Sequence, residues 1–337
     1  MNIYDISKKS GVSIATVSRI INGSSKVSLK TKEKVLAVID KYGYTPNAFA
    51  RGLGKNSMNT IGILCADSSD PYLAHAVYFV EQKLRESGYD CLLCCTGHQL
   101  EDRKKYLKLL LSKHVDSVIL IGSNYVQPDP DQNQYILDAS RKIPVMLLNG
   151  ELDGPNVFST LCDDFHAMFS TTSKLLKTRG SDILYLYDNI SYSGKKKLAG
   201  FREAFKVNDI PVNEDLILSI APIPFSLKSV CNALTGIANR GIKFNSVMTS
   251  NDSLAIGALK YAISAGICVP HELSIIGYNN SDIAEYCDPE LTSIDNKLEA
   301  ISRQCVNTMV GVLSGKDMPQ KTVFAAELVK RGTANIS

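Results

Sequence analysis

Short apolar runs alternate with amphipathic stretches from Thr60 to about residue 290, and this alternation constrains the fold more than any other feature. Apolar runs occupy residues 61–65, 89–95, 115–121, 144–148, 183–187, 246–248 and 273–276, and helical spacing occurs at 72–86 and 101–113. Strand–helix repetition predicts parallel sheets with helices on both faces. Because this stretch is too long for one small doubly wound sheet, we expect two lobes, with the break near residues 156–162.

Ligands of open parallel sheets bind at the carboxyl ends of the strands. The residues that follow the apolar runs therefore predict a polar binding cleft between the lobes; they are Asp67, Ser68, Pro71, Tyr72, Leu73, Ser123, Asn124, Asp163, Asp164, Asn251, Asp252, Asn279 and Asn280. Asp and Asn also cap helices, so cap and ligand contact stay open alternatives at Asp252. Tyr185, Tyr187 and Tyr192 fit sugar stacking or strand packing, and we assign them no role.

Composition excludes several classes of protein. With 45% hydrophobic and 21% charged residues the 337-residue chain is ordinary globular protein. It contains no apolar run of transmembrane length and no signal-peptide pattern, which predicts a cytoplasmic protein without a membrane partner. Most of the nine cysteines lie in apolar runs, which favours reduced, buried thiols at Cys65, Cys91, Cys94, Cys95 and Cys268.

Catalytic chemistry finds no support in the motifs. Cys91, Cys94 and Cys95 lack the second Cys or His pair of a zinc site, and no glycine-rich phosphate loop follows the first apolar run. No nucleophile–base pair can be singled out. We therefore expect no catalytic residue, no metal, no cofactor and no enzymatic activity.

Positive charge is concentrated at the N-terminus. Residues 1–60 contain ten Lys and Arg against three Asp and Glu, a charge of +7, so with a total of +3 the remainder carries −4. A basic segment on an acidic body is typical of proteins that bind polyanions such as DNA, although an ordinary solvated surface has the same composition.

Three short helices fit the first 44 residues. The first runs from about Ile3 to Lys9 and ends at Gly11, and the second, capped by Ser13, runs over residues 14–21. Ser28 caps a third helix whose apolar face is Val35, Leu36, Ile39 and Tyr42. Two helices joined by a tight glycine-containing turn predict a helix-turn-helix.

The second helix of such a motif enters the major groove of DNA with its N-terminal residues. Ile14, Ala15, Thr16, Ser18 and Arg19 are the candidates for base contact, while Val17 and Ile20 face the core. The Arg19 guanidinium can donate two hydrogen bonds to one guanine. Alternatively, Arg19 contacts a phosphate or is an ordinary solvated surface arginine.

Residues 45–54 predict a further helix of about two turns, with Thr45 as cap and Pro46 at its first position. So short a helix needs a partner to form in water. Ala50 and Leu53 share one face, which suits a leucine wedged into the minor groove, or else a linker packed on the body. The polar stretch 55–60 marks a domain boundary.

The stretches 3–6, 11–19, 22–23 and 44–53 resemble the headpiece of the lactose-repressor (LacI/GalR) family of bacterial transcription regulators. The resemblance implies a homodimer on a pseudopalindromic double-stranded operator. It places Tyr4, Ser13, Ile14, Ala15, Thr16, Ser18, Arg19, Asn22, Asn47, Ala50 and Leu53 against DNA, with paired hinge helices wedging Leu53 into the central minor groove.

The resemblance continues through 67–74, 198–201, 250–258, 276–280 and 289–294 to about Arg331. It implies an all-α helix-turn-helix headpiece (1–45), a hinge helix and linker (46–59) and an α/β two-lobed periplasmic-binding-protein-like domain (60–331). Lobe one is expected at about 60–160 plus 292–322, and lobe two at about 161–291 plus 323–331. With Asp67, Ser68 and Asp163 from the strand ends, the resemblance places Tyr72, Leu73, Ser123, Lys197, Asn251, Asp252, Asn279 and Asn296 near a small-molecule effector.

Three positions depart from the family pattern: Gly54 replaces an alanine-like residue of the hinge helix, and in the cleft the family usually has Arg at Lys197 and Asp at Asn279. A lysine in that place suggests an effector with an anionic group, or a solvated helix start at residues 195–197. The sequence predicts an allosteric transcriptional repressor whose effector is a sugar or sugar derivative. The alternative is a soluble solute-binding protein or sugar-converting enzyme with an incidental basic N-terminal module. Besides DNA and the effector, a protein corepressor is a candidate third partner of the regulator.

Overall fold

The computed structural model describes residues 1–21, 26–44, 57–220 and 226–336. They divide into two compact units, residues 1–60 with 114–116, and residues 61–113 with 117–337.

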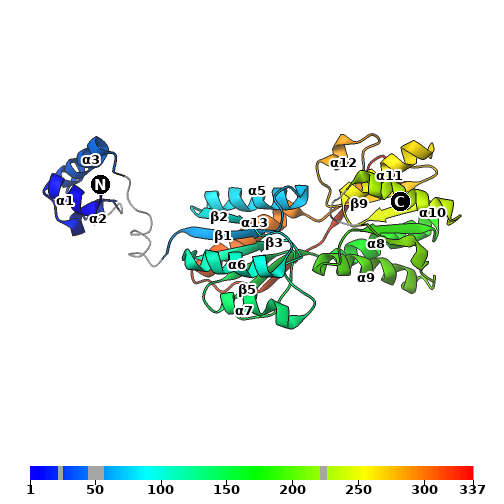
Figure 1. Cartoon of the computed structure of the whole chain (residues 1–337), viewed down its shortest axis with the longest axis horizontal. Coiled ribbons are helices and arrows are strands. Elements are labelled where there is room, and N and C mark those ends of the chain that lie inside the picture. Colours follow the sequence, from blue (N-terminus) through cyan, green and yellow to red (C-terminus); the bar gives the residue numbers. More distant parts are fainter. Residues whose placement is uncertain (22–25, 45–56, 221–225, 337) are drawn as a thin grey trace. The chain divides into compact units, whose positions relative to one another are not determined.

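The N-terminal unit holds three helices around a small core: α1 (Ile3–Ser10), α2 (Ile14–Ile21) and α3 (Leu29–Tyr42) (Figure 1). Asn2 and Asp5 form a capping box at the start of α1, and Gly11 ends it in the left-handed conformation that glycine adopts without strain. Ile6, Val17, Ile20 and Val35 make up the buried core of this unit.

The apolar face expected for α3 is partly wrong. Leu36 and Tyr42 are exposed, whereas Val38 packs against the core beside Ile39. Leu36 directly follows the buried Val35, and one step of about 100° along a helix carries a side chain away from the core.

Lobe one of the larger unit is a six-stranded sheet in the order β11-β5-β4-β3-β1-β2. Its strands are β1 (Thr60–Cys65), β2 (Asp90–Cys95), β3 (Ser117–Ile121), β4 (Val145–Leu148), β5 (Val157–Cys162) and β11 (Lys321–Phe324). The strands from β11 to β1 pair in parallel. Helices α5 (Pro71–Glu86) and α13 (Leu298–Leu313) cover one face, and α6 (Leu100–Ser112) and α7 (Gln134–Ser140) lie on the other (Figure 1). A short 3₁₀ turn, η1 (Pro130–Asn133), precedes α7.

Lobe two is a second sheet in the order β12-β10-β9-β8-β6-β7. It contains β6 (Ile183–Tyr187), β7 (Ile217–Ser219), β8 (Ser246–Thr249), β9 (Ser274–Tyr278), β10 (Thr292–Asp295) and β12 (Glu327–Val329). Only the β10–β12 pair among the described pairings of this sheet is antiparallel. Helices α8 (Asp164–Arg179) and α9 (Tyr192–Val207) pack on one face, and α10 (Leu227–Asn239) and α11 (Asp252–Ala265) on the other. A 3₁₀ turn, η2 (Glu214–Leu216), and the short α12 (Ile283–Tyr286) complete it.

The chain passes between the lobes three times, after β5, after β10 and between β11 and β12. These crossings shift the expected boundaries. Residues 157–162 form the strand next to the β11 edge of the first sheet, so the new series begins only with α8. Residues 292–295 pair with β9 in lobe two, because the return to lobe one begins with α13 rather than with the strand before it.

The cysteine prediction is wrong for β2 and for Cys268. β2 is an edge strand, so Cys95, Leu92 and Leu93 are exposed and Cys91 and Cys94 are half-buried; Cys268 is exposed as well. All nine thiols are free, and Cys65 is buried as expected. None of the described helices is long and apolar enough to cross a lipid bilayer.

Candidate functional site

The outer face of α2 is the first candidate site. Val17 and Ile20 are buried in the small core, which turns the rest of the helix outward. Ser13, Ile14, Ala15 and Arg19 are exposed, and Thr16 and Ser18 are half-buried. Tyr4 on α1 is also exposed.

The start of α2 is fixed by its own residues. The Ser13 hydroxyl accepts a hydrogen bond from the Thr16 amide (3.3 Å) and lies 2.9 Å from the Thr16 hydroxyl, as expected for a helix cap. Ile14 and Ala15 therefore stand on a rigid first turn. The remaining candidates, Asn22, Asn47, Ala50 and Leu53, and the expected hinge helix lie outside the described residues.

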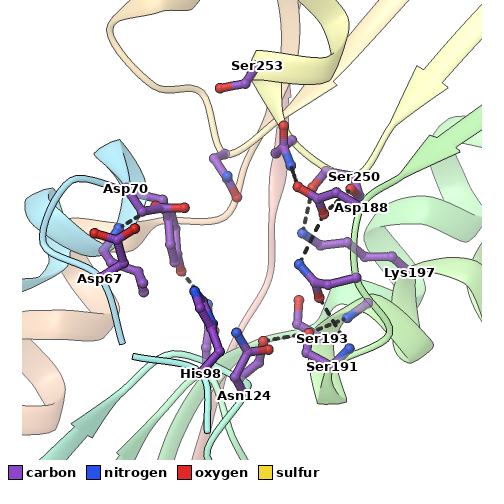
Figure 2. A pocket seen from close by; sticks show the side chains of 18 of the residues that line it. Asp67, Asp70, His98, Asn124, Asp188, Ser191, Ser193, Lys197, Ser250 and Ser253 are labelled. Atoms are coloured by element: carbon purple, nitrogen blue, oxygen red, sulfur yellow. Dashed lines mark hydrogen bonds between the residues drawn. The ribbon is translucent and has the colours of Figure 1, made fainter. Parts of the chain in front are cut away.

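The second candidate site is a cleft of about 670 Å³ between the two lobes, where the strands of both sheets end (Figure 2). Asp67 and Asp70 face it from lobe one, and Asp188, Lys197 and Ser250 lie across from them on lobe two. Eight of the predicted effector residues line this cleft: Asp67, Tyr72, Leu73, Ser123, Lys197, Asn251, Asp252 and Asn279.

Three predicted residues lie away from the lining. Asp163 caps α8, where its carboxylate accepts from the His166 amide (3.1 Å) and contacts the His166 ring (2.7 Å). Ser68 is exposed between two lining residues. Asn296 is buried beneath the cleft and donates to the Tyr72 hydroxyl and to Asn279, both at 3.2 Å.

On lobe one the carboxylates are held by local hydrogen bonds. Asp67 accepts from the amide (2.8 Å) and the hydroxyl (2.7 Å) of Ser69, which lowers the pKa of Asp67. Asp70 caps α5 by accepting from the Leu73 amide at 3.0 Å. Both groups are therefore fixed in direction, and each presents carboxylate oxygen to the cleft as a hydrogen-bond acceptor.

On lobe two Asn251 is committed to the protein. Its side-chain oxygen caps α11 at the Leu254 amide (3.0 Å), and its side-chain nitrogen donates to Asp188 (2.7 Å). Asp188 also accepts from Asn189 (3.0 Å) and Ser250 (3.3 Å). A carboxylate has about four acceptor positions, so Asp188 retains roughly one for a ligand.

Asp252 supports the loop beside the cleft. Its carboxylate accepts from the Ser281 amide and hydroxyl (both 2.7 Å) and from the Ser293 hydroxyl (2.6 Å). Burial raises the pKa of Asp252. The loop turns sharply at Asn279, whose φ of 100° lies in the region that asparagine tolerates better than most residues.

Lys197 is buried rather than solvated. Its ammonium donates to the Ser250 carbonyl (2.9 Å) and lies 3.7 Å from the centre of the Tyr278 ring. Burial lowers the pKa of Lys197, against the opposing effect of Asp164, Asp188 and Asp252. Of these three carboxylates, Asp188 and Asp252 line the cleft together with Lys197, so the lining there carries negative as well as positive charge.

Several lining residues were missed although a signal existed. Asp188, Asn149 and Ser250 lie within two residues after an apolar run, so the rule that selected Asp67 and Ser123 selects them too. Arg103 had no such signal, because it reaches the cleft from inside α6. It donates to the Asn124 carbonyl and, at 2.8 Å, to that of His98, and so ties together two loops of lobe one.

Comparison with known proteins covers both units. The model of bacterial regulatory proteins of the lacI family matches residues 2–47, and that of the periplasmic binding protein-like domain matches residues 176–334. An HTH-type transcriptional regulator of Lachnoclostridium phytofermentans is 49% identical over 99% of this chain and 100% of its own length.

Solved structures agree in fold over nearly the whole chain. The lac repressor dimer bound to operator and the anti-inducer ONPF has a TM-score of 0.88 at 23% identity, covering 99% of this chain and 98% of the other. The complex of the transcriptional regulator CelR with cellobiose has a TM-score of 0.71 at 25% identity, covering 99% of both chains. This chain belongs to the lacI family of bacterial regulatory proteins and is a helix-turn-helix transcriptional regulator.

Proposed function

We propose that the chain is a sequence-specific repressor that reads a pseudopalindromic operator as a homodimer and is controlled by a small sugar in the cleft. The observation that carries the proposal is the presence of two features in one chain: an outward face of α2 that exposes Ile14, Ala15 and Arg19, and a cleft lined by fixed hydrogen-bond acceptors. The rival reading, a solute-binding protein or a sugar-converting enzyme, explains the cleft but leaves the basic helix-turn-helix unit without a role.

The cleft supports an uncharged sugar. The carboxylates of Asp67, Asp70, Asp188 and Asp252 outnumber the cationic lining residues Arg103 and Lys197. Carboxylate oxygens accept hydrogen bonds from sugar hydroxyls but repel phosphate or carboxylate groups. CelR, a relative in fold, is solved with the uncharged disaccharide cellobiose.

We expect the sugar to control operator binding through thermodynamic linkage between ligand binding and the arrangement of the lobes. A ligand that contacts both lobes favours their closed arrangement, and it changes operator affinity only if DNA favours one arrangement over another. The homodimer is supported by exposed apolar side chains on lobe one, with Tyr78 on α5 and Leu92 and Leu93 on β2. The proposed compartment is the cytoplasm, where the promoter lies. A protein corepressor stays a prediction, to be tested by pull-down.

The test is fluorescence anisotropy of the full-length protein with labelled DNA from upstream of its own gene. We expect specific binding that shifts on adding cellobiose or another neutral sugar, and no shift with sugar phosphates. Sugar binding by calorimetry without any preference for the upstream DNA over a scrambled duplex would favour the solute-binding rival. Operator binding that responds to anionic sugars alone would contradict the assignment of an uncharged effector.

A further inference from the structure

The N-terminus of α9 contacts both lobes. Ser191, which caps this helix, accepts a hydrogen bond from the Ser123 hydroxyl of lobe one at 2.7 Å. The amide of Tyr192 donates to the Ser123 carbonyl at 3.4 Å. Further along α9, Ser193 and Lys197 face the cleft (Figure 2). Any contact that holds this helix end against lobe one therefore also sets the distance between the cleft walls.

One such contact lies outside the cleft lining. Tyr192 donates its hydroxyl hydrogen bond to Glu151, which follows β4 in lobe one. Lys321, the first residue of β11 in the same lobe, donates to the other oxygen of Glu151. Neither Tyr192 nor Glu151 lines the cleft, so the contact forms without touching a ligand.

This contact has the chemistry of a strong hydrogen bond. A hydroxyl that donates to an ionised carboxylate makes a shorter, stronger bond than a neutral pair. Burial would raise the pKa of Glu151, but the hydrogen bonds from Lys321 and Tyr192 outweigh it and lower that pKa, so the carboxylate is ionised at neutral pH. Burial raises the pKa of Tyr192, which keeps its proton. His75 on α5 and Asp282 of lobe two also approach each other (3.6 Å), but both side chains are exposed, so this contact contributes little.

We infer that Glu151 is a positioning residue: through the Tyr192 hydroxyl it holds the start of α9 against lobe one and favours the closed arrangement of the lobes. Sensitivity to the effector is then set partly by a pair of residues that never meets the effector. Loss of the pair raises the population of the open arrangement. Because less of the protein is then in the closed arrangement, the apparent affinity for a ligand that binds this arrangement falls.

The test is amide hydrogen exchange of the full-length protein without added ligand, resolved to single residues by mass spectrometry with electron-transfer fragmentation. The amide at position 192 bonds across the lobes, whereas the Lys195 amide bonds to Ser191 within lobe two at 2.9 Å. Opening of the lobes exposes the first amide and leaves the second protected, and fraying of the helix exposes both.

In Tyr192→Phe we expect exchange at position 192 to be about tenfold faster, the factor for loss of one hydrogen bond to a charged group, with position 195 unchanged. Glu151→Gln keeps an acceptor without the charge and should accelerate position 192 by a smaller factor. Tyr286→Phe removes a hydroxyl from a side chain that is 79% exposed on α12 and is the matched control.

Two results would overturn the inference. One is a wild-type exchange rate at position 192 in both Tyr192→Phe and Glu151→Gln. The other is equal acceleration at positions 192 and 195, which would mean that the hydroxyl stabilises only the helix end. Because no ligand is used, neither result depends on the identity of the effector.

Discussion

Arg19 is the residue on which operator specificity should depend most. It is exposed on α2, and its guanidinium can make two parallel hydrogen bonds to one guanine, which a lysine ammonium cannot. We expect Arg19→Lys to retain binding to scrambled duplex and to lose about 1–3 kcal/mol of operator binding. Anisotropy with both duplexes measures the difference. A variant that keeps the full operator preference would make Arg19 a phosphate contact.

Asp188 and Asp163 form a matched pair for testing the cleft. Both are aspartates near strand ends, but Asp188 lines the cleft and Asp163 caps α8. Asp188→Asn should weaken binding of a neutral sugar effector by about tenfold, since it removes a charged acceptor. Asp163→Asn should leave sugar affinity unchanged, because asparagine caps helices as well as aspartate does. Calorimetry on both variants decides the assignment; equal losses would place the ligand elsewhere.

For single residues, the sequence predicts where polar side chains come together but not which groups they bind. The strand-end rule brings Asp67, Ser123 and Asn251 to one cleft, because the carboxyl ends of parallel strands share an edge. It cannot show that the Asn251 amide is already engaged by Leu254 and Asp188. Leu254 is only three residues further on, as in any helix cap, but Asp188 follows another strand, and only the folded chain brings it to Asn251.

Among the elements, the packing of α9 against α8 depends on Gly200. A Cβ atom at this position would lie 2.2 Å from the Phe165 carbonyl oxygen and 3.1 Å from the Phe169 amide nitrogen, so the helices would have to separate. We expect Gly200→Ala to lower the free energy of unfolding by about 1–3 kcal/mol.

Gly236 on α10 is the control for this prediction. A Cβ atom there meets nothing within 4 Å, and alanine is the better helix former, so Gly236→Ala should stabilise by about 0.4–1 kcal/mol. Urea unfolding monitored by circular dichroism gives both values. Destabilisation by both substitutions would contradict the close approach of α8 and α9 as the cause.

Element types follow from the sequence better than element positions in the sheet. The alternation predicts β2 as a strand, yet β2 lies at the edge, and Leu92 and Leu93 are exposed. An apolar run has the same composition at an edge as in the centre, and strand order is decided by crossovers far along the chain. The bounds of the headpiece helices follow more directly from the sequence, because Gly11 and Gly43 end α1 and α3 in the left-handed conformation that glycine adopts without strain.

At the scale of the whole molecule, the affinity for DNA and the affinity for the effector should depend differently on salt concentration. The first 60 residues carry a charge of +7, and each phosphate they neutralise releases counterions. If the dimer contacts six or more phosphates, operator affinity should fall by about 10³ or more between 50 and 200 mM salt. Binding of a neutral sugar should change by less than about twofold, since no net charge is transferred. Anisotropy and calorimetry in the same buffers test this, and a flat DNA response would exclude the basic unit as the reader.

Three passages of the backbone join the lobes, and they leave neither lobe as a continuous stretch of the gene. Lobe one requires β11 and α13 from the last 40 residues, and lobe two requires β10 and β12 from either side of them. A single protease cut therefore liberates neither half. A premature stop codon near residue 290 would remove β10 and β12 from lobe two and, at the same time, α13 and β11 from lobe one. Because neither lobe is encoded by a continuous stretch, recombination between related genes should exchange the two lobes together.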